Sequence, residues 1–415
     1  MLECRISILL FLTKRTGLTM SDAPSIADSS PDNPSGTMAR IPFNMPPVTG
    51  REIEYLSKVI ERREFSGNGV FTAQCQSWLK QRLDVGEVIL THSCTAALEM
   101  AAILAGLEPG DEVIMPSFTF VSTANAVVLR RAIPVFVDIR PDTLNIDEHQ
   151  IEAAITPRTK AICVVHYAGV CAEMDKIQQI AQIHGLIVIE DAAQALLSTY
   201  RDRPAGRLGE LACFSFHETK NVTAGEGGAL TINDPRFSER AYVIWEKGTN
   251  RRALKLGLID KYSWIDYGSS FLPSEFVAAV LLAQLEEIER LTEDRRATWK
   301  RYHAGFASLE AAGLVRRPIV PAHCVHNGHL YYLLVRDQIA RDLLIQNLRA
   351  EEILAPFHYV PLHSSLAGQR YARASGKMPV TNDASARLIR LPLYAGMAPA
   401  VADRVIGRVG AHLRA

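Results

Sequence analysis

The stretch Leu186-Ile187-Val188-Ile189-Glu190-Asp191 is an unbroken apolar run that ends in two acids. A run of this kind is typical of a strand buried on both faces of a parallel sheet, whose carboxyl end opens onto a ligand crevice. The pattern therefore predicts that Asp191 lies where ligands bind. An aspartate followed by Ala-Ala-Gln also fits a helix N-cap, and the two roles are compatible.

Further apolar runs repeat this pattern along the chain. They cover residues 112–115, 135–138 and 161–165 and a run that starts at Ala212, and helical stretches such as 174–184 separate them at crossover length. Strands that alternate with helices predict an α/β fold with a mostly parallel sheet. Apolar residues at helical spacing then predict one long helix from Pro273 to about Arg301. We expect this helix to link a large domain (41–290) to a smaller C-terminal α/β domain (291–415).

A lysine follows another short apolar run. In Phe214-Ser215-Phe216-His217-Glu218-Thr219-Lys220, the lysine lies 29 residues beyond the aspartate (220 − 191). Its Ser- and Gly-rich surroundings favour a desolvated neutral amine, which a Schiff base requires. The carboxylate of Asp191 would keep a pyridine nitrogen protonated. Together the two residues predict a pyridoxal 5′-phosphate (PLP) site, whereas Lys220 alone fits a solvated surface lysine.

The composition argues against several other classes of protein. The 415 residues are 48% hydrophobic and 22% charged, which is ordinary for a globular chain. Lys plus Arg equal Asp plus Glu at 45 each, so no basic field attracts nucleic acid or an anionic membrane. The seven cysteines are odd in number and form no Cys-x-x-Cys pair, which argues against a disulfide framework and a zinc site. We therefore expect no metal and a reducing cytoplasm.

Residues 1–40 form a separate N-terminal extension. The apolar run at 6–12 is too short for a membrane span and lacks the small-residue cleavage site of a secretion signal. Residues 21–36 are rich in Ser, Pro and Asp and are predicted to be a flexible tail. Met20 and Met38 are alternative start positions.

Four further blocks carry a family resemblance. They are Ile41-Pro42-Phe43-Asn44 and residues 91–100, 116–125 and 246–251. With the stretches around Asp191 and Lys220, they resemble the DegT/StrS sugar-nucleotide aminotransferases, a branch of the fold-type I PLP enzymes, over residues 41–414. Within this family, they are most similar to the transaminases that make dTDP-4-amino-4,6-dideoxygalactose.

The resemblance implies a role for each residue of the cofactor site. Lys220 would hold PLP through the Schiff base, Asp191 would pair with the pyridine nitrogen, Gln194 would contact the ring hydroxyl, Phe120 would stack on the ring, and Thr95, the Ala96 amide and Ser215 would bind the phosphate. The local pattern agrees, because a helix opens at Thr95 directly after the strand-like run 87–90, and helix amino ends bind phosphate. Taken singly, Thr95 fits an ordinary cap and Phe120 an ordinary core aromatic.

One block departs from the family pattern. Many relatives carry Gly-x-Asn-x-Arg, whose asparagine reaches the phosphate of the neighbouring subunit, where this chain has Gly268-Ser269-Ser270. Ser270 can donate one hydrogen bond, with a shorter reach than asparagine. The resemblance implies a homodimer with shared active sites, in which Ser270 and Asn250 face the partner's cofactor.

Substrate contacts are expected at the cleft between the domains. His166 and Tyr167 directly follow a predicted strand, and the resemblance places His363, in the stretch 357–363, together with residues 390–394 at the cleft. The implied reaction moves an amino group from L-glutamate to the C4 ketone of dTDP-4-keto-6-deoxy-D-glucose. The product, dTDP-4-amino-4,6-dideoxy-D-galactose, serves a bacterial surface polysaccharide of the enterobacterial common antigen type.

Three alternatives stay open. The first is another nucleotide-sugar 3- or 4-aminotransferase. The second is a PLP-dependent sugar dehydratase, and some relatives that dehydrate rather than aminate have a histidine in place of the lysine. The third is a non-catalytic binding or regulatory protein on the same fold. Lys220, Asp191 and Ser215 are all present, which favours transamination.

Overall fold

The computed structural model describes residues 39–414. Residues from Arg40 onward form one compact unit. The extension predicted over residues 1–40, with its apolar run and the alternative starts Met20 and Met38, lies outside the described residues except at its last two positions. Within residues 39–414, no helix combines the length and the apolar composition that a membrane crossing needs.

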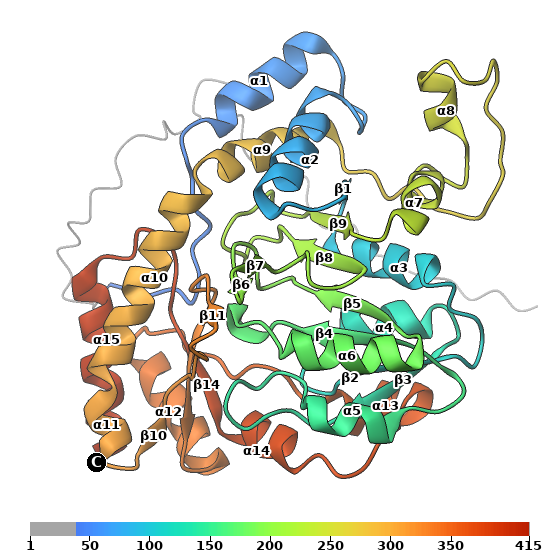
Figure 1. Cartoon of the computed structure of the whole chain (residues 1–415). Coiled ribbons are helices and arrows are strands. Elements are labelled where there is room, and N and C mark those ends of the chain that lie inside the picture. The colour runs from blue at the N-terminus through green and yellow to red at the C-terminus, as the bar shows by residue number, and fades with distance from the viewer. Residues whose placement is uncertain (1–38, 415) are drawn as a thin grey trace, which may run out of the picture. The chain divides into compact units, whose positions relative to one another are not determined.

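An eight-stranded sheet carries the fold (Figure 1). Its strands, in spatial order, are β1 (Glu87–Thr91), β9 (Gly228–Ile232), β8 (Leu211–Ser215), β5 (Ile187–Asp191), β4 (Thr159–Val165), β2 (Glu112–Pro116), β3 (Ile133–Val137) and β13 (Arg373–Ala374). The six strands from β8 to β13 are parallel, and β9 runs antiparallel to both β8 and β1. The predicted α/β fold with a mostly parallel sheet is confirmed.

Helices cover both faces of this sheet because each central strand sends alternate side chains to opposite sides. Val188 joins one hydrophobic cluster and Ile189 the other. The helices of the first cluster are α1 (Glu52–Arg62), α2 (Val70–Leu83), α5 (Glu148–Ala154), α6 (Met174–His184) and α9 (Glu275–Glu286), and those of the second are α3 (Cys94–Leu104), α4 (Val121–Val128) and α7 (Ser238–Trp245). The helix predicted over 174–184 is α6, with the same bounds.

The C-terminal part has its own sheet and hydrophobic cluster. Its elements are β10 (Val315–Arg316), β12 (Tyr331–Val335), β14 (Leu388–Leu391), α10 (Ile288–Gly305), α11 (Ala307–Ala311), α12 (Gln338–Ala350) and α15 (Pro399–Arg414). The remaining strands and α-helices are β6 (Thr199–Tyr200), β7 (Arg203–Pro204), β11 (Cys324–Val325), α8 (Arg251–Lys255), α13 (Leu366–Tyr371) and α14 (Pro379–Arg387). The domain boundary near residue 290 stays a prediction, since β13 belongs to the large sheet.

The single helix predicted over 273–301 is two helices, α9 and α10, and this part of the prediction is wrong. The break is at Glu287, whose backbone angles (φ −108°, ψ 6°) leave the helical region. Its N–H donates to the carbonyl of Gln284 at 3.2 Å, a tight i to i−3 closure that ends α9. Leu285 and Ile288, on either side of the break, are both buried. The apolar spacing therefore continues through the break, and spacing alone does not reveal it.

Candidate active site

The amino end of α3 is shaped for an anion. Ser93 caps the helix, and its Oγ accepts a hydrogen bond from the Ala96 amide at 3.1 Å. Gly228 of β9 lies so close that a Cβ there would be 2.4 Å from the Ser93 carbonyl carbon, so the approach requires glycine. Thr95 lines a cavity of about 590 Å³, with its Oγ1 2.7 Å from the Ser122 hydroxyl. Helix amino ends stabilise negative charge.

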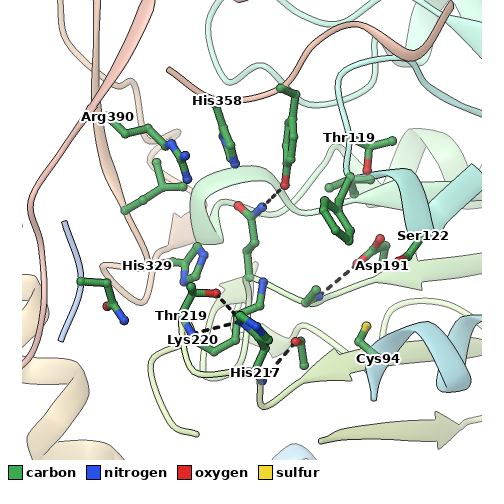
Figure 2. A pocket seen from close by; sticks show the side chains of 18 of the residues that line it. Cys94, Thr119, Ser122, Asp191, His217, Thr219, Lys220, His329, His358 and Arg390 are labelled. Atoms are coloured by element: carbon green, nitrogen blue, oxygen red, sulfur yellow. Dashed lines mark hydrogen bonds between the residues drawn. The ribbon is translucent and has the colours of Figure 1, made fainter. Parts of the chain in front are cut away.

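Lys220 follows β8 on a tight turn, in which its own N–H donates to the His217 carbonyl at 2.9 Å. The side chain is half-buried and lines the cavity (Figure 2). Burial lowers the pKa of Lys220, and the nearby charge of Arg390 adds to this effect, while Cys94 and Asp191 oppose it. A lowered pKa favours the neutral amine, which is the nucleophilic form.

Asp191 ends β5, lines the same cavity and is 5% exposed. Its Oδ2 accepts the Thr123 hydroxyl at 2.7 Å, and its Oδ1 accepts the Ala193 amide at 3.2 Å. Burial raises the pKa of Asp191, while these hydrogen bonds and the charge of Lys220 oppose the rise. Both hydrogen-bond donors are neutral, so a cation that enters the cavity would stabilise the carboxylate.

These side chains fit PLP. The amino end of α3, with the hydroxyls of Thr95 and Ser215, suits the phosphate. Asp191 offers a buried carboxylate to a protonated ring nitrogen, and Lys220 offers the amine. The cavity volume of about 590 Å³ is also ordinary for a small-molecule site.

Six of the residues predicted to bind the cofactor line this one cavity. They are Thr95, Phe120, Asp191, Gln194, Ser215 and Lys220. The Gln194 amide is largely engaged, because its Oε1 accepts the Ala168 amide and its Nε2 donates to the Tyr359 hydroxyl, both at 2.8 Å. One N–H of Gln194 is left for a ligand. Phe120 is 57% exposed, which suits a ring that waits for a stacking partner.

Three other predicted cofactor contacts do not line this cavity. The Ala96 amide already donates to Ser93, which the sequence reasoning did not single out as the cap. Asn250 uses its Oδ1 to accept the Ser263 amide at 2.7 Å, and exposed Ser270 forms a backbone bridge with Glu246. The contacts of Asn250 and Ser270 with a partner's cofactor stay a prediction.

The three predicted substrate contacts are also absent from the lining of this cavity, and their substrate roles stay a prediction. His166 is fully buried, with its Nε2 2.8 Å from Glu190 and its Nδ1 accepting the Ala172 amide. Since both ring nitrogens are engaged, His166 would have to give up one of these contacts to bind a substrate. Tyr167 is buried and its hydroxyl is 2.8 Å from His358 Nδ1.

His363 likewise has a structural contact. Its Nδ1 lies 2.7 Å from the hydroxyl of Ser117, and its backbone N–H donates to the same hydroxyl at 3.0 Å. The pair ties the turn 362–364 to the end of β2. The stretch 357–363 does reach the cavity, but through His358 and Tyr359.

The sequence reasoning gave no individual role to several residues that line or brace the cavity, although it placed the stretches 357–363 and 390–394 at the cleft. These residues are Thr123, His329, His358, Tyr359 and Arg390. Thr123 lies within the block 116–125 that carries the family resemblance, and Arg390 starts the stretch 390–394, so both signals were present in the sequence. His329 carries no such local signal. Its position comes from tertiary packing, which brings its Nδ1 2.9 Å from Oδ1 of Asn221.

Comparisons with known proteins show the family of this chain. The DegT/DnrJ/EryC1/StrS aminotransferase family matches residues 47–410. The spore coat polysaccharide biosynthesis protein SpsC of Bacillus subtilis is 34% identical over 378 residues, which are 89% of this chain and 96% of SpsC. The GDP-perosamine synthase of Caulobacter vibrioides is 32% identical over 381 residues, 89% of this chain and 97% of the synthase.

A solved structure supports the cofactor. Spr1654 of Streptococcus pneumoniae in its PLP form, described as a sugar aminotransferase, superposes with a TM-score of 0.83 and 26% identity. The match covers 91% of this chain and 99% of Spr1654. The family match spans most of the chain, and the cavity holds an amine, an acid and an anion site that fit PLP. This protein is therefore a PLP-dependent enzyme and belongs to the DegT/DnrJ/EryC1/StrS aminotransferase family.

Proposed function

We propose that this protein transfers an amino group from L-glutamate to the C4 ketone of dTDP-4-keto-6-deoxy-D-glucose, giving dTDP-4-amino-4,6-dideoxy-D-galactose. The observation that carries the aminotransfer is the single cavity that contains Lys220 and Asp191. The sugar substrate is supported by the sequence blocks that resemble transaminases of this product. SpsC and GDP-perosamine synthase, whose names refer to polysaccharide and to a GDP-linked product, support sugar-nucleotide chemistry and a role in surface polysaccharide synthesis.

Each residue of the site has a part in this reaction. Bound PLP supplies an electron sink. Asp191 keeps the ring nitrogen protonated, and the amino end of α3 with Thr95 and Ser215 binds the phosphate. The lowered pKa of Lys220 lets its amine take a proton from the donor α-carbon and return a proton to the sugar carbon. Retention of Lys220 disfavours a dehydratase of the histidine type.

We further propose a homodimer in which each chain completes the partner's site. Residues 247–270, which include α8, form an arm that extends away from the sheet in Figure 1. The arm exposes large apolar side chains, Leu256 (61%), Leu258 (73%), Trp264 (78%) and Ile265 (56%). Exposed apolar groups in one segment favour contact with another chain. Asn250 and Ser270 belong to this arm.

A cytoplasmic location is part of the proposal. Six cysteines lie within the described residues, and all six are free thiols. Five of them are buried. Free thiols suit a reducing compartment.

The test is to incubate the purified protein with L-glutamate and, separately, the 3-keto and the 4-keto dTDP-6-deoxy sugars. NMR of the product then identifies the amino sugar and its configuration. An axial C4 amine from the 4-keto sugar supports the proposal, and an equatorial amine indicates a glucose-configured product. Amination of the 3-keto sugar alone refutes the proposed substrate and leaves aminotransfer intact. A purified protein without the near-visible absorption of lysine-bound PLP would instead favour the non-catalytic alternative.

A further inference from the structure

His329 is held in one tautomer by a pair of asparagines. Asn221 is the residue after Lys220, and its side chain is buried. Its Nδ2 donates to the carbonyl of Asn327 at 2.9 Å, and its Oδ1 lies 2.9 Å from Nδ1 of His329. A carbonyl only accepts, so the Asn221 amide has one possible orientation and its oxygen accepts the hydrogen of Nδ1. In the neutral ring of His329, Nε2 is therefore unprotonated.

The backbone around His329 is fixed as well. Oδ1 of buried Asn327 accepts the N–H of His329 at 3.0 Å. The Nδ2 of Asn327 donates to the carbonyls of Gln194 and Leu196, both at 2.9 Å. From α10, Arg295 donates to the carbonyl of His329 at 2.5 Å. Since these contacts come from separate parts of the chain, the His329 ring is held in a defined position.

The unprotonated nitrogen of His329 belongs to the active site. His329 and Lys220 are both among the side chains that line the cavity in Figure 2. In the described part of the chain, Nε2 of His329 has no hydrogen-bond partner. Burial holds the pKa of His329 well below its ordinary value. Charge on its titratable neighbours lowers this pKa further, and these neighbours are Lys220, Arg295, His358 and Arg390. The ring is therefore neutral, and it can accept a hydrogen bond but does not hold an extra proton.

A neutral acceptor suits the ammonium form of Lys220. In the proposed reaction, the C–H bond of the donor α-carbon breaks, its electron pair stays with the cofactor, and the proton forms a new N–H bond on Lys220. The ammonium then has three N–H groups to satisfy in a buried place. The charged groups that act on Lys220 are Cys94, Asp191 and Arg390. Asp191 faces the ring nitrogen in this reaction, burial keeps the Cys94 thiol protonated by raising its pKa, and Arg390 repels a cation.

We propose that His329 is a positioning residue whose Nε2 accepts a hydrogen bond from Lys220, and that it holds the amine in place while Lys220 takes up and releases the proton. Asn221 and Asn327 set the tautomer and the position of the ring for this contact. This inference rests on the proposed aminotransfer.

Two substitutions separate this role from a merely structural one. His329→Asn keeps an N–H that can donate to Asn221 but removes the acceptor at Nε2. His329→Gln places an amide oxygen near the position of Nε2 but gives up the donor to Asn221. The matched control is His149→Asn, at a histidine of α5 whose side chain is 74% exposed. A structural His329 would tolerate asparagine better than glutamine, and the proposed acceptor would tolerate glutamine better than asparagine.

The first measurement uses the protein without cofactor, in which the amine of Lys220 is free. The pH dependence of its acetylation, followed by peptide mass spectrometry, gives the pKa of Lys220. We expect His329→Asn to lower this pKa by about one unit, because the ammonium loses its acceptor, and His329→Gln to lower it by less than about half a unit. A pKa that is unchanged or raised in His329→Asn would refute the proposal.

The second measurement follows the two half-reactions of the PLP-loaded enzyme in single turnovers. Because Lys220 moves the proton in both, His329→Asn should slow the reactions with L-glutamate and with the 4-keto sugar about 10-fold each, and His329→Gln less than about 3-fold. With α-deuterated L-glutamate, the isotope effect should be larger in His329→Asn than in the wild type, since proton transfer then limits the rate. A loss confined to the sugar half-reaction would assign Nε2 to a sugar hydroxyl and overturn the proposal.

The outcomes separate this inference from the proposed function. A wild type that reacts with no amino acid would refute the proposed function, while the pKa of Lys220 would still test the contact with His329. Cofactor content and melting temperature establish that each variant is folded. If His329→Asn does not fold, nitrogen NMR of the wild type tests the tautomer, with the signals of His329 assigned by their loss in His329→Gln. A proton on Nε2 in the protein without cofactor would refute the proposal.

Discussion

The large sheet buries one carboxylate at the amino edge of its parallel strands and another at their carboxyl edge. The two carboxylates have opposite surroundings. At the amino end of β2, fully buried Glu112 accepts hydrogen bonds from Arg373 at 3.0 and 2.7 Å and from Arg158 at 2.6 Å. Arg373 is the main reason that the pKa of Glu112 falls to about 2. At the carboxyl end of β5, Asp191 has only neutral donors, and burial raises its pKa.

The difference indicates that Glu112 contributes to the stability of the fold, whereas Asp191 contributes to the function of the site. Glu112 joins β2 to Arg373 of β13, so its charge is satisfied within the chain and needs no ligand. The charge of Asp191 is costly to bury until a cation enters the cavity. Ligands of open α/β sheets bind beyond the carboxyl ends of the strands, and the unsatisfied acid lies at that edge. Substitutions at the two edges should therefore change different properties.

The largest effect is expected at the carboxyl edge from Lys220→Ala. Without the amine, turnover should fall about 10⁴-fold or more, because both covalent attachment and proton transfer are lost. The melting temperature of the protein without cofactor should stay close to that of the wild type. Exposed Lys58 on α1 provides the control, Lys58→Ala, which should keep full activity. Borohydride reduction and peptide mapping give an independent check, and PLP found on another lysine would refute the assignment.

Asp191→Asn should have the next largest effect on turnover. The variant should still bind PLP through its phosphate but lose about 10²- to 10³-fold in turnover, because an amide does not hold the ring nitrogen protonated. Since the substitution removes an uncompensated buried charge, the protein without cofactor should be as stable as the wild type or more stable. Steady-state kinetics and thermal unfolding measure the two properties. Turnover equal to that of the wild type would contradict the role of Asp191.

Glu112→Gln should have the reverse profile at the amino edge. Loss of the charge leaves Arg373 without its counter-ion, so the free energy of unfolding should fall by about 2–3 kcal/mol. Turnover per folded molecule should stay within about twofold of the wild type, because Glu112 lies away from the reacting atoms. A denaturant titration measures the free energy of unfolding, and steady-state kinetics measure the turnover. If turnover fell with intact folding, the division between the two edges would be wrong.

The pH dependence of the protein's stability follows from the ion pair between Glu112 and Arg373. The pKa of Glu112 is about 2 in the folded protein, below its ordinary 4.5, so its ion pair stabilises fully above pH 4.5 and less as the pH falls toward 2. The stability difference between wild type and Glu112→Gln should therefore be constant near pH 6 and shrink below pH 4.5. A difference that grows on acidification would contradict the lowered pKa.

Local pattern was enough to predict part of this arrangement. The apolar run before Asp191 gave the buried strand, and the helical spacing gave the bounds of α6, because both signals lie in consecutive residues. The lysine and the acid were predicted from the resemblance as well as from their local settings. The pairing of Glu112 with Arg373 joins residues 261 positions apart, so no local pattern predicts it.

Which face of the sheet a side chain points to was harder to predict than the end of the strand at which it lies. His166 follows β4 at the expected edge, but its ring turns to Glu190, which also accepts the amides of Gly206, Leu208 and Gly209. Neighbouring residues of a strand point to opposite faces, so Glu190 is satisfied in the interior while Asp191 faces the cavity. The acids that end the strand look alike in sequence, and only the packing distinguishes them.

The smallest effect is expected from Ser270→Ala, which tests whether a second chain completes the carboxyl edge. Ser270 is exposed and does not line its own cavity, so a contribution to PLP binding has to reach a partner's site. One lost hydrogen bond should raise the PLP dissociation constant about 3- to 10-fold and leave turnover at saturating PLP unchanged. Equilibrium dialysis measures the constant, Ser269→Ala is the neighbouring control, and Asn250→Ala should act in the same direction. A fully active monomer in sedimentation, or equal PLP affinity in Ser270→Ala and wild type, would mean that one chain builds the PLP site without Ser270. The contrast between the edges would then be a property of the single chain.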